Sequence, residues 1–228
     1  MIKAVIFDLD GTLADTLETL AYYGNKTLEH IGLPPIETQR FRYLVGRGAR
    51  VLMEDMLISS GREPDGSTVE GMLADFNRMY LENTMYLTKP YPGIPELLQV
   101  LKNNGLKLAV FSNKPDAATQ KVVSALFGEA FDFVLGKREE LPRKPAPDGA
   151  LLAARKLGVT PEECLYVGDT DTDMQTGTAA GMTTVGVLWG FRTRAELEQN
   201  NARYIACKPD DIFGIAERIN GALHLIQI

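Results

Sequence analysis

The sequence predicts an α/β protein: a Rossmann-like, doubly wound parallel sheet with an inserted α-helical domain. Two observations lead to this fold class. Short apolar, β-branched runs alternate with amphipathic helical patterns from Tyr91 onward, which is typical of a parallel sheet with helices on both faces. Polar motifs follow several of these runs, and open α/β sheets bind their ligands at the carboxyl ends of the strands.

The expected strands are the short apolar runs at residues 4–7, 106–112, 131–135, 164–168 and 184–187, with a weaker one at 203–206. Helical patterns alternate with them at residues 95–103, 116–126, 148–157, 171–180 and 210–225. Asp116 and Asp148 stand at the start of two of these helices. We expect both to act as N-caps, because a carboxylate can accept hydrogen bonds from the free amides of a first helical turn.

Residues 15–88 break this alternation, because they contain no convincing strand. Amphipathic helical patterns lie instead at 17–30, 37–44, 49–59 and 69–86, and connectors rich in Gly and Pro separate them. The chain returns through the Pro- and Gly-rich stretch 89–93. We therefore predict a core domain of residues 1–14 and 89–228, a helical domain of residues 15–88, and a two-stranded hinge between them.

The composition disfavours several classes of function. The chain is 45% hydrophobic and 24% charged, as in ordinary soluble proteins. Its net charge of -6 argues against a nucleic-acid partner, since phosphate backbones are held by clustered Lys and Arg. No apolar run has the length of a membrane span, and the start enters a core strand without a signal peptide.

We interpret Cys164 and Cys207 as reduced core residues of a cytoplasmic protein. His30 and His224 lie far from the acidic motifs, so we expect no histidine catalysis.

The most informative motif is Asp8-Leu9-Asp10-Gly11-Thr12, which follows the first expected strand. Two carboxylates this close repel one another and resist ionising together unless a cation lies between them. At the carboxyl end of a parallel strand, the compensating partners are usually a metal ion and a phosphate. Asp8 is placed to attack phosphorus. Asp10 is placed to protonate the leaving oxygen and then to deprotonate a water.

Two further motifs supply groups that bind a phosphate ester. Ser112 ends the second expected strand of the core, Asn113 follows it, and the Ser112 side chain and the backbone amide of Asn113 can bind phosphate oxygens. Lys144 precedes a helix and supplies a compact positive charge for the transferring group. The expected partner is therefore a small phosphate ester.

A fourth motif completes a metal site. Asp169 follows the expected strand 164–168. Together with Asp8 and the carbonyl of Asp10, it offers the hard oxygen ligands that suit Mg2+. The chain is therefore expected to use Mg2+ as its cofactor.

This order of motifs resembles the haloacid dehalogenase-like hydrolase superfamily, specifically its Mg-dependent aspartyl-phosphate phosphatases. The likeness covers essentially the whole chain, and the helical insertion is similar to the small α-helical cap of that superfamily. The resemblance gives Asp8 and Asp10 the roles described above and implies that Asp173 supports the metal site through water or Lys144. We count Thr12, the last residue of the first motif, among the phosphate-binding residues.

Within the superfamily, residues 44–53, 112–115 and 187–191 resemble phosphoglycolate phosphatases. This likeness implies 2-phosphoglycolate as the substrate. It also implies a substrate contact by Arg47, which lies in a Gly-flanked turn that opens a helix. The sequence leaves open whether the protein is a monomer or a homodimer.

Three alternatives compete with a phosphatase. A β-phosphoglucomutase-like phosphotransferase would use the same intermediate on Asp8, but those mutases carry a lysine where this chain has Val45, although Arg50 agrees with them. Dehalogenases of the superfamily need no metal and lack the second aspartate. A non-catalytic binding protein would be expected to have lost one of the four motifs, and none is missing.

Overall fold

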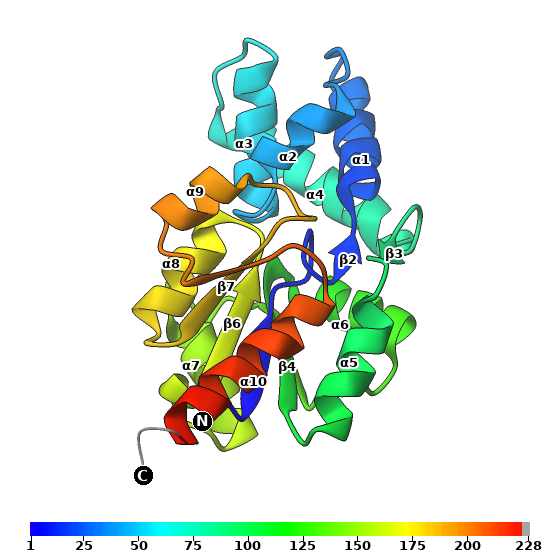
Figure 1. Ribbon diagram of the computed structural model, residues 1–228. Coiled ribbons are helices and arrows are strands. Elements are labelled where there is room, and N and C mark those ends of the chain that lie inside the picture. The colour runs from blue at the N-terminus through cyan, green and yellow to red at the C-terminus, as the bar shows by residue number, and fades with distance from the viewer. Residues whose placement is uncertain (225–228) are drawn as a thin grey trace.

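Six parallel strands form the central sheet of the structure, a computed structural model that describes residues 1–224 (Figure 1). They are β1 (Ala4–Phe7), β4 (Lys107–Pro115), β5 (Phe133–Lys137), β6 (Cys164–Gly168), β7 (Thr183–Val187) and β8 (Tyr204–Ala206). Their order is β5-β4-β1-β6-β7-β8, so the chain adds strands outward from β1 first on one side and then on the other. The doubly wound parallel sheet expected from the alternating patterns is confirmed.

The pairing register brings the carboxyl ends of three strands together. Phe7, the last residue of β1, lies opposite Val110 of β4 and Val167 of β6. The residues that follow these positions therefore emerge at one edge of the sheet, among them Asp8 and Asp169. This register helps to bring together two polar motifs that lie more than 150 residues apart in the chain.

Helices cover both faces of this sheet. They are α5 (Ile94–Asn103), α6 (Asp116–Phe127), α7 (Asp148–Leu157), α8 (Asp171–Ala179), α9 (Arg194–Gln199) and α10 (Asp210–His224). Alternate residues of β1 belong to separate hydrophobic clusters, because successive side chains of a strand point to opposite faces. Val5 and Phe7 pack in a cluster with α5 and α10, whereas Ala4 and Ile6 pack in a cluster with α7.

The helical insertion lies above the carboxyl edge of the sheet (Figure 1). We call it the cap; its elements are α1 (Leu17–His30), the 3-10 helix η1 (Thr38–Arg40), α2 (Phe41–Leu44), α3 (Ala49–Ser59) and α4 (Gly66–Glu82). These helices bury their apolar faces in a hydrophobic cluster of their own, which Phe191 of the core joins. The stretch expected as one helix at 37–44 is divided between η1 and α2.

The chain passes between core and cap twice, side by side. Strand β2 (Ala14–Asp15) pairs antiparallel with β3 (Lys89–Pro90). The two-stranded connection expected from the Gly- and Pro-rich flanks of the insertion is therefore present. The chain therefore enters and leaves the helical insertion through these four paired residues.

Two helix starts differ from the prediction. Pro115 and Pro147 occupy the N-cap positions of α6 and α7, and Asp116 and Asp148 are the first helical residues, so the expectation that these two aspartates are N-caps was wrong. Asp116 serves another purpose, because its carboxylate accepts a hydrogen bond from the amide of Gly136 (2.8 Å). Helix α9 was not expected, and Leu225 at the end of the last expected helix lies outside the described residues.

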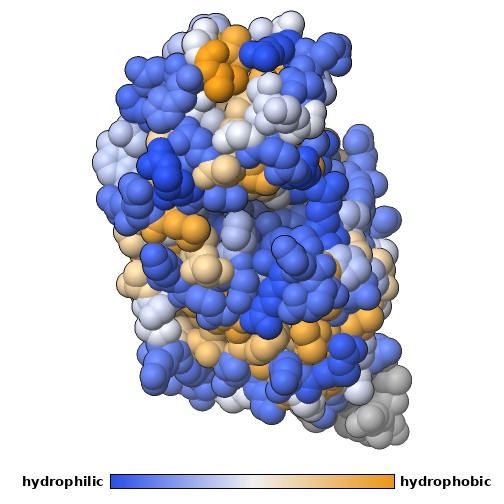
Figure 2. All heavy atoms as spheres, turned by 180° about the vertical axis from the view of Figure 1, so that it is seen from behind, coloured by the Kyte–Doolittle hydropathy of each residue, from blue (hydrophilic) through white to orange (hydrophobic). Residues whose placement is uncertain are grey.

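Cys164 is buried and Cys207 is exposed, and both thiols are free. The expectation that Cys207 is a core residue was wrong, because it lies between β8 and α10, where its amide donates to Asp211 (2.8 Å). Within residues 1–224 no helix combines the length and apolarity needed to cross a bilayer. Figure 2 shows hydrophilic side chains over most of the rear face, with apolar ones in scattered patches.

Candidate active site

Asp8 follows β1 directly and is almost fully buried. Its amide donates to the carbonyl of Val167 (2.9 Å), which continues the pairing with β6 and holds the backbone in place. Lys144 Nζ lies 2.7 Å from Oδ1 of Asp8 and 2.7 Å from Oδ1 of Asp173. The structure thus brings the expected nucleophile and the expected phosphate-binding lysine into contact, and Asp173 holds that lysine from a second side.

Asp169 is fully buried beside Asp8. Its Oδ1 accepts a hydrogen bond from the Thr12 hydroxyl (2.9 Å), and its Oδ2 accepts one from the amide of Phe191 (2.8 Å). Gly11 turns the chain toward this carboxylate with a φ of +89°, in the left-handed region that favours glycine. The structure therefore directs the Thr12 hydroxyl to Asp169, and Thr12 is not among the residues that line the cavity described below.

Asp8, Asp169 and Asp173 form a cluster in which one carboxylate oxygen from each residue lies within 4.8 Å of those from the other two. Burial, followed by the carboxylate of Asp173, raises the pKa of Asp8 to about 7, although Lys144 opposes the shift. The same two causes raise the pKa of Asp169 well above its usual value. Three buried carboxylates against one lysine leave a deficit of positive charge. A divalent cation with hard oxygen ligands would balance it, so these residues fit Mg2+.

Asp10 makes a separate ion pair, with Lys114 at the end of β4. Lys114 Nζ lies 2.7 Å from Oδ1 and 2.8 Å from Oδ2 of Asp10, and both side chains are largely buried. Burial lowers the pKa of Lys114, but the Asp10 carboxylate outweighs it and raises that pKa above its usual value, so the ammonium stays charged. The sequence-based prediction did not include Lys114. The available signal was its place in the motif after β4, two residues beyond Ser112.

Asn113 connects three segments of the chain. Its side-chain oxygen accepts from the amide of Lys144 (2.8 Å), and its side-chain nitrogen donates to the carbonyls of Lys144 (3.2 Å) and of Gly46 in the cap (3.1 Å). Ser112 is buried next to it, and its hydroxyl accepts from the amide of Lys114 (3.3 Å). The Asn113 side chain therefore sets the position of the Lys144 loop relative to both β4 and the cap.

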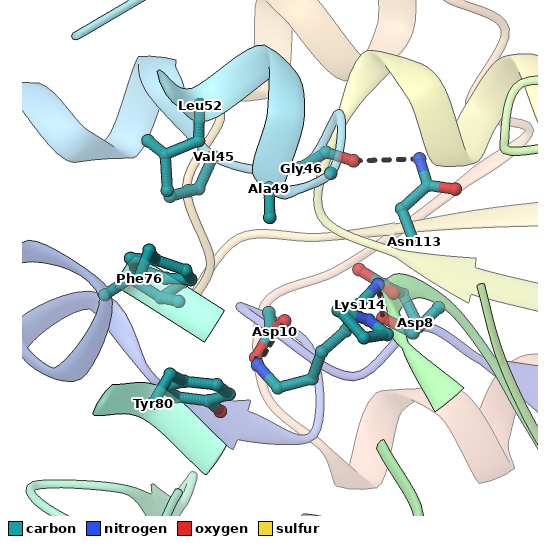
Figure 3. A pocket seen from close by; sticks show the side chains of 14 residues that line it. Asp8, Asp10, Val45, Gly46, Ala49, Leu52, Phe76, Tyr80, Asn113 and Lys114 are labelled. Carbon is teal, nitrogen blue, oxygen red and sulfur yellow. Dashed lines mark hydrogen bonds and ion pairs between the residues drawn. The ribbon is translucent and has the colours of Figure 1, made fainter. Parts of the chain in front are cut away.

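A small cavity of about 50 Å3 lies between core and cap (Figure 3). Its polar side is formed by Asp8, Asp10, Ser112, Asn113 and Lys114. Apolar cap side chains face them, namely Leu20, Val45, Ala49, Leu52 and Phe76. Such a cavity has room for only about three to five water-sized positions.

Arg47, an expected substrate contact, has another partner in the structure. Its guanidinium pairs with Asp55 of α3 at 2.5 Å and remains half exposed. Arg47 does not line the cavity, although Gly46 and Gly48 on either side of it do. The Gly-flanked turn therefore presents its backbone to the cavity and its arginine to the cap surface.

A reciprocal pair of arginines joins the cap to the loop that supports Asp169. The side chain of Arg42 in α2 donates to the carbonyls of Gly190 and Phe191. The side chain of Arg192 donates in turn to the carbonyl of Arg42. Because the amide of Phe191 also binds Asp169, the cap is held to the same loop as the carboxylate cluster.

Comparisons with known proteins agree with this geometry. Residues 5–187 match the family model described as haloacid dehalogenase-like hydrolase. The chain is 36% identical over 211 residues to the phosphoglycolate phosphatase of Aquifex aeolicus, covering 92% of this chain and 94% of that protein. It is 35% identical over 191 residues to the N-acetylmuramic acid 6-phosphate phosphatase of Pseudomonas aeruginosa, covering 83% of each. The crystal structure of a predicted phosphoglycolate phosphatase from Haemophilus somnus superimposes with a TM-score of 0.87 at 29% identity, covering 94% of this chain and 97% of that one.

Proposed function

Because this chain belongs to the haloacid dehalogenase-like hydrolases and is a phosphatase of that family, we propose that it hydrolyses a small phosphorylated metabolite through an aspartyl-phosphate on Asp8, with 2-phosphoglycolate as the first candidate. One observation carries the proposal. The buried Asp8 carboxylate contacts Lys144 at 2.7 Å and lines the cavity between core and cap. This is the arrangement that attack on a phosphoryl group requires.

In the first step an oxygen of Asp8 forms a bond to phosphorus while the bond from phosphorus to the ester oxygen breaks. Asp10, which must carry a proton at this step and so give up one of its two contacts with Lys114, donates that proton to the leaving oxygen, so the product leaves as a neutral alcohol group. Lys144 neutralises the charge on the phosphoryl oxygens, and the Ser112 hydroxyl and the amide of Asn113 donate to them.

In the second step a water attacks phosphorus and Asp10 takes its proton. The bond between phosphorus and Asp8 breaks, which releases inorganic phosphate and restores the Asp8 carboxylate. Asp10 thus ends the cycle protonated, as it began. Apolar cap residues such as Leu52 and Phe76 limit the water that reaches Asp8 before this step.

Mg2+ would be held by Asp8, Asp169 and the carbonyl of Asp10, the oxygen ligands of this site. When bound, it supplies positive charge that keeps the carboxylates ionised and offsets charge on the phosphoryl group. Asp173 acts on Lys144, whose ammonium it holds at 2.7 Å. Thr12 orients Asp169 through its hydroxyl.

The cavity favours a substrate with few atoms. With a space of about 50 Å3, a short phosphorylated acid would require less outward movement of the cap than a sugar phosphate. Val45, which lines the cavity, presents methyl groups where the mutases that this chain resembles carry a lysine. We therefore favour hydrolysis over a phosphoglucomutase-like phosphoryl transfer.

We also propose that residues 15–88 act as a mobile cap on a core of residues 1–14 and 89–228. The paired strands β2 and β3 are its connection to the core, and the cavity lies at the boundary between the two parts. Closure would exclude bulk water during attack by Asp8, and opening would release the products. The free thiols of Cys164 and Cys207 are in keeping with a cytoplasmic location.

The test is phosphate release from a panel that includes 2-phosphoglycolate, N-acetylmuramic acid 6-phosphate and hexose phosphates, with Mg2+ and with EDTA. We expect 2-phosphoglycolate to give the highest kcat/KM, and turnover to require Mg2+. Asp8→Asn should abolish turnover, with Asp132→Asn on the core surface as the control. Full activity of Asp8→Asn, or no turnover of any ester by folded protein with Mg2+, would contradict the proposal.

A further inference from the structure

Resting on the proposed function, we propose that Lys114 and the hydroxyl of Tyr80 form the subsite that recognises a carboxylate on the leaving group of the substrate. The substrate class is then a phosphate monoester of a short hydroxy acid. The two residues come from different parts of the molecule, Lys114 from the end of β4 and Tyr80 from α4 of the cap. Figure 3 shows the Lys114 side chain reaching past the cavity floor toward Asp10 and the Tyr80 ring.

Lys114 is correctly placed to meet the leaving group. Its ammonium is bound to both oxygens of Asp10, the residue that protonates the ester oxygen in the proposed reaction. A lysine ammonium has three N–H donors, and the two carboxylate oxygens engage two of them. A carboxylate bonded to the ester carbon would therefore lie near the third donor while the ester oxygen faces Asp10.

Tyr80 supplies a second donor next to this ammonium. Lys114 Nζ lies 4.8 Å from the centre of the Tyr80 ring, and the ring stacks on Phe76 with 5.7 Å between centroids. The Tyr80 residue is 2% exposed, and its hydroxyl lies near the Lys114 ammonium without completing a hydrogen bond of normal geometry. A buried hydroxyl without a partner is unfavourable, and an oxygen of a bound ligand would satisfy it. Because Tyr80 lines the cavity, that ligand would lie beside Lys114.

No other described residue that lines the cavity could neutralise an anion. Of the described residues that line the cavity, Lys114 alone carries a positive charge; the others are two aspartates and uncharged residues. A carboxylate taken from water into apolar surroundings needs a charged partner and hydrogen bonds. Lys114 and Tyr80 provide both. An uncharged leaving group would leave the Tyr80 hydroxyl and the third ammonium donor with less to bind.

The experiment compares 2-phosphoglycolate with 2-hydroxyethyl phosphate, in which a neutral hydroxymethyl group replaces the carboxylate. The measured quantity is the ratio of kcat/KM for the two esters. We expect Lys114→Met to lower this ratio by about tenfold or more, the value of a charge-assisted hydrogen bond. Tyr80→Phe removes one oxygen and should lower it by about threefold to tenfold. Tyr43→Phe, an exposed tyrosine of the cap, is the matched control.

The ratio separates recognition from general damage, because a loss of Asp10 function or of folding affects both esters alike. If Lys114→Met does not fold, Tyr80→Phe still decides the question. An unchanged ratio in folded variants, with wild-type protein active on 2-phosphoglycolate, would overturn the inference and leave the proposed function intact. No phosphate release by wild-type protein from either ester would instead overturn 2-phosphoglycolate as the substrate, and the inference with it.

Discussion

Asn113 and Lys144 exchange two hydrogen bonds: the amide of Lys144 donates to the Asn113 side-chain oxygen (2.8 Å), and the Asn113 side-chain nitrogen donates to the Lys144 carbonyl (3.2 Å). One side chain thus fixes both backbone groups of the lysine whose ammonium contacts Asp8. We assign the Asn113 side chain to the positioning of Lys144, and only its backbone amide to the phosphate.

Asn113→Ala should lower kcat by about tenfold to a hundredfold, because Lys144 loses the support that holds its ammonium at Asp8. The backbone amide of residue 113 remains, so the loss reports on the side chain alone. Stability should fall by about 1–3 kcal/mol, since a buried amide and carbonyl of Lys144 lose their partners. Steady-state kinetics and urea unfolding measure the two effects. Asn103→Ala, on the exposed side of α5, is the control, and an unchanged kcat in Asn113→Ala would contradict the positioning role.

The sequence places Asp8 and Asp169 together because both follow strands of a parallel sheet, and the ends of such strands meet at one edge. Lys114 and Tyr80 could not be paired in this way. The contact depends on which face α4 turns to the core, and helical periodicity shows which residues share a face but not what that face meets. Arg47 illustrates the same limit. Its place in a Gly-flanked turn predicts a substrate contact, whereas the structure shows its side chain paired with Asp55.

Asp169→Asn should remove the stabilisation of the protein by Mg2+. Wild-type protein should gain about 2.7 kcal/mol at a hundredfold excess of Mg2+ over its Kd. The variant should show no such gain. In EDTA its Tm should equal or exceed that of wild type, because a buried carboxylate that raises the repulsion in the cluster becomes neutral. The Asn amide can still accept from Phe191 and donate to the Thr12 hydroxyl, so the fold keeps these contacts.

Thermal unfolding with Mg2+ and with EDTA checks this expectation independently of turnover. Asp171→Asn is the matched control, since its half-exposed carboxylate lies two residues away and faces Arg192 at 3.7 Å. That control should keep the full shift. A shift of wild-type size in Asp169→Asn would show that Mg2+ binds elsewhere.

Gly190→Ala should displace the Asp169 carboxylate by steric overlap. A Cβ at this position would overlap the Asp169 side chain and the Gly11 carbonyl, neither of which can move without displacing the site. We expect a loss of about 3 kcal/mol, near the upper end for overpacking, together with a large fall in kcat. Gly71→Ala is the contrasting control, because its Cβ meets nothing within 4 Å in the exposed part of α4. It should stabilise the protein by up to about 1 kcal/mol. Near wild-type unfolding and kcat in Gly190→Ala would contradict the close packing seen here.

Arg42→Met should weaken the hold of the cap on the core. The Arg42 guanidinium donates to the carbonyls of Gly190 and Phe191, so its loss removes hydrogen bonds that favour the closed position. A charge-assisted bond of about 1.5–3 kcal/mol corresponds to a fall in kcat/KM of about tenfold to a hundredfold. We expect it chiefly as a higher KM, because closure follows binding and the groups around Asp8 stay in place. Hydrogen exchange of α2 should rise in parallel. Arg40→Met, an exposed arginine in η1, should change neither quantity, and an unchanged KM with unchanged exchange in Arg42→Met would mean that these contacts do not hold the cap closed.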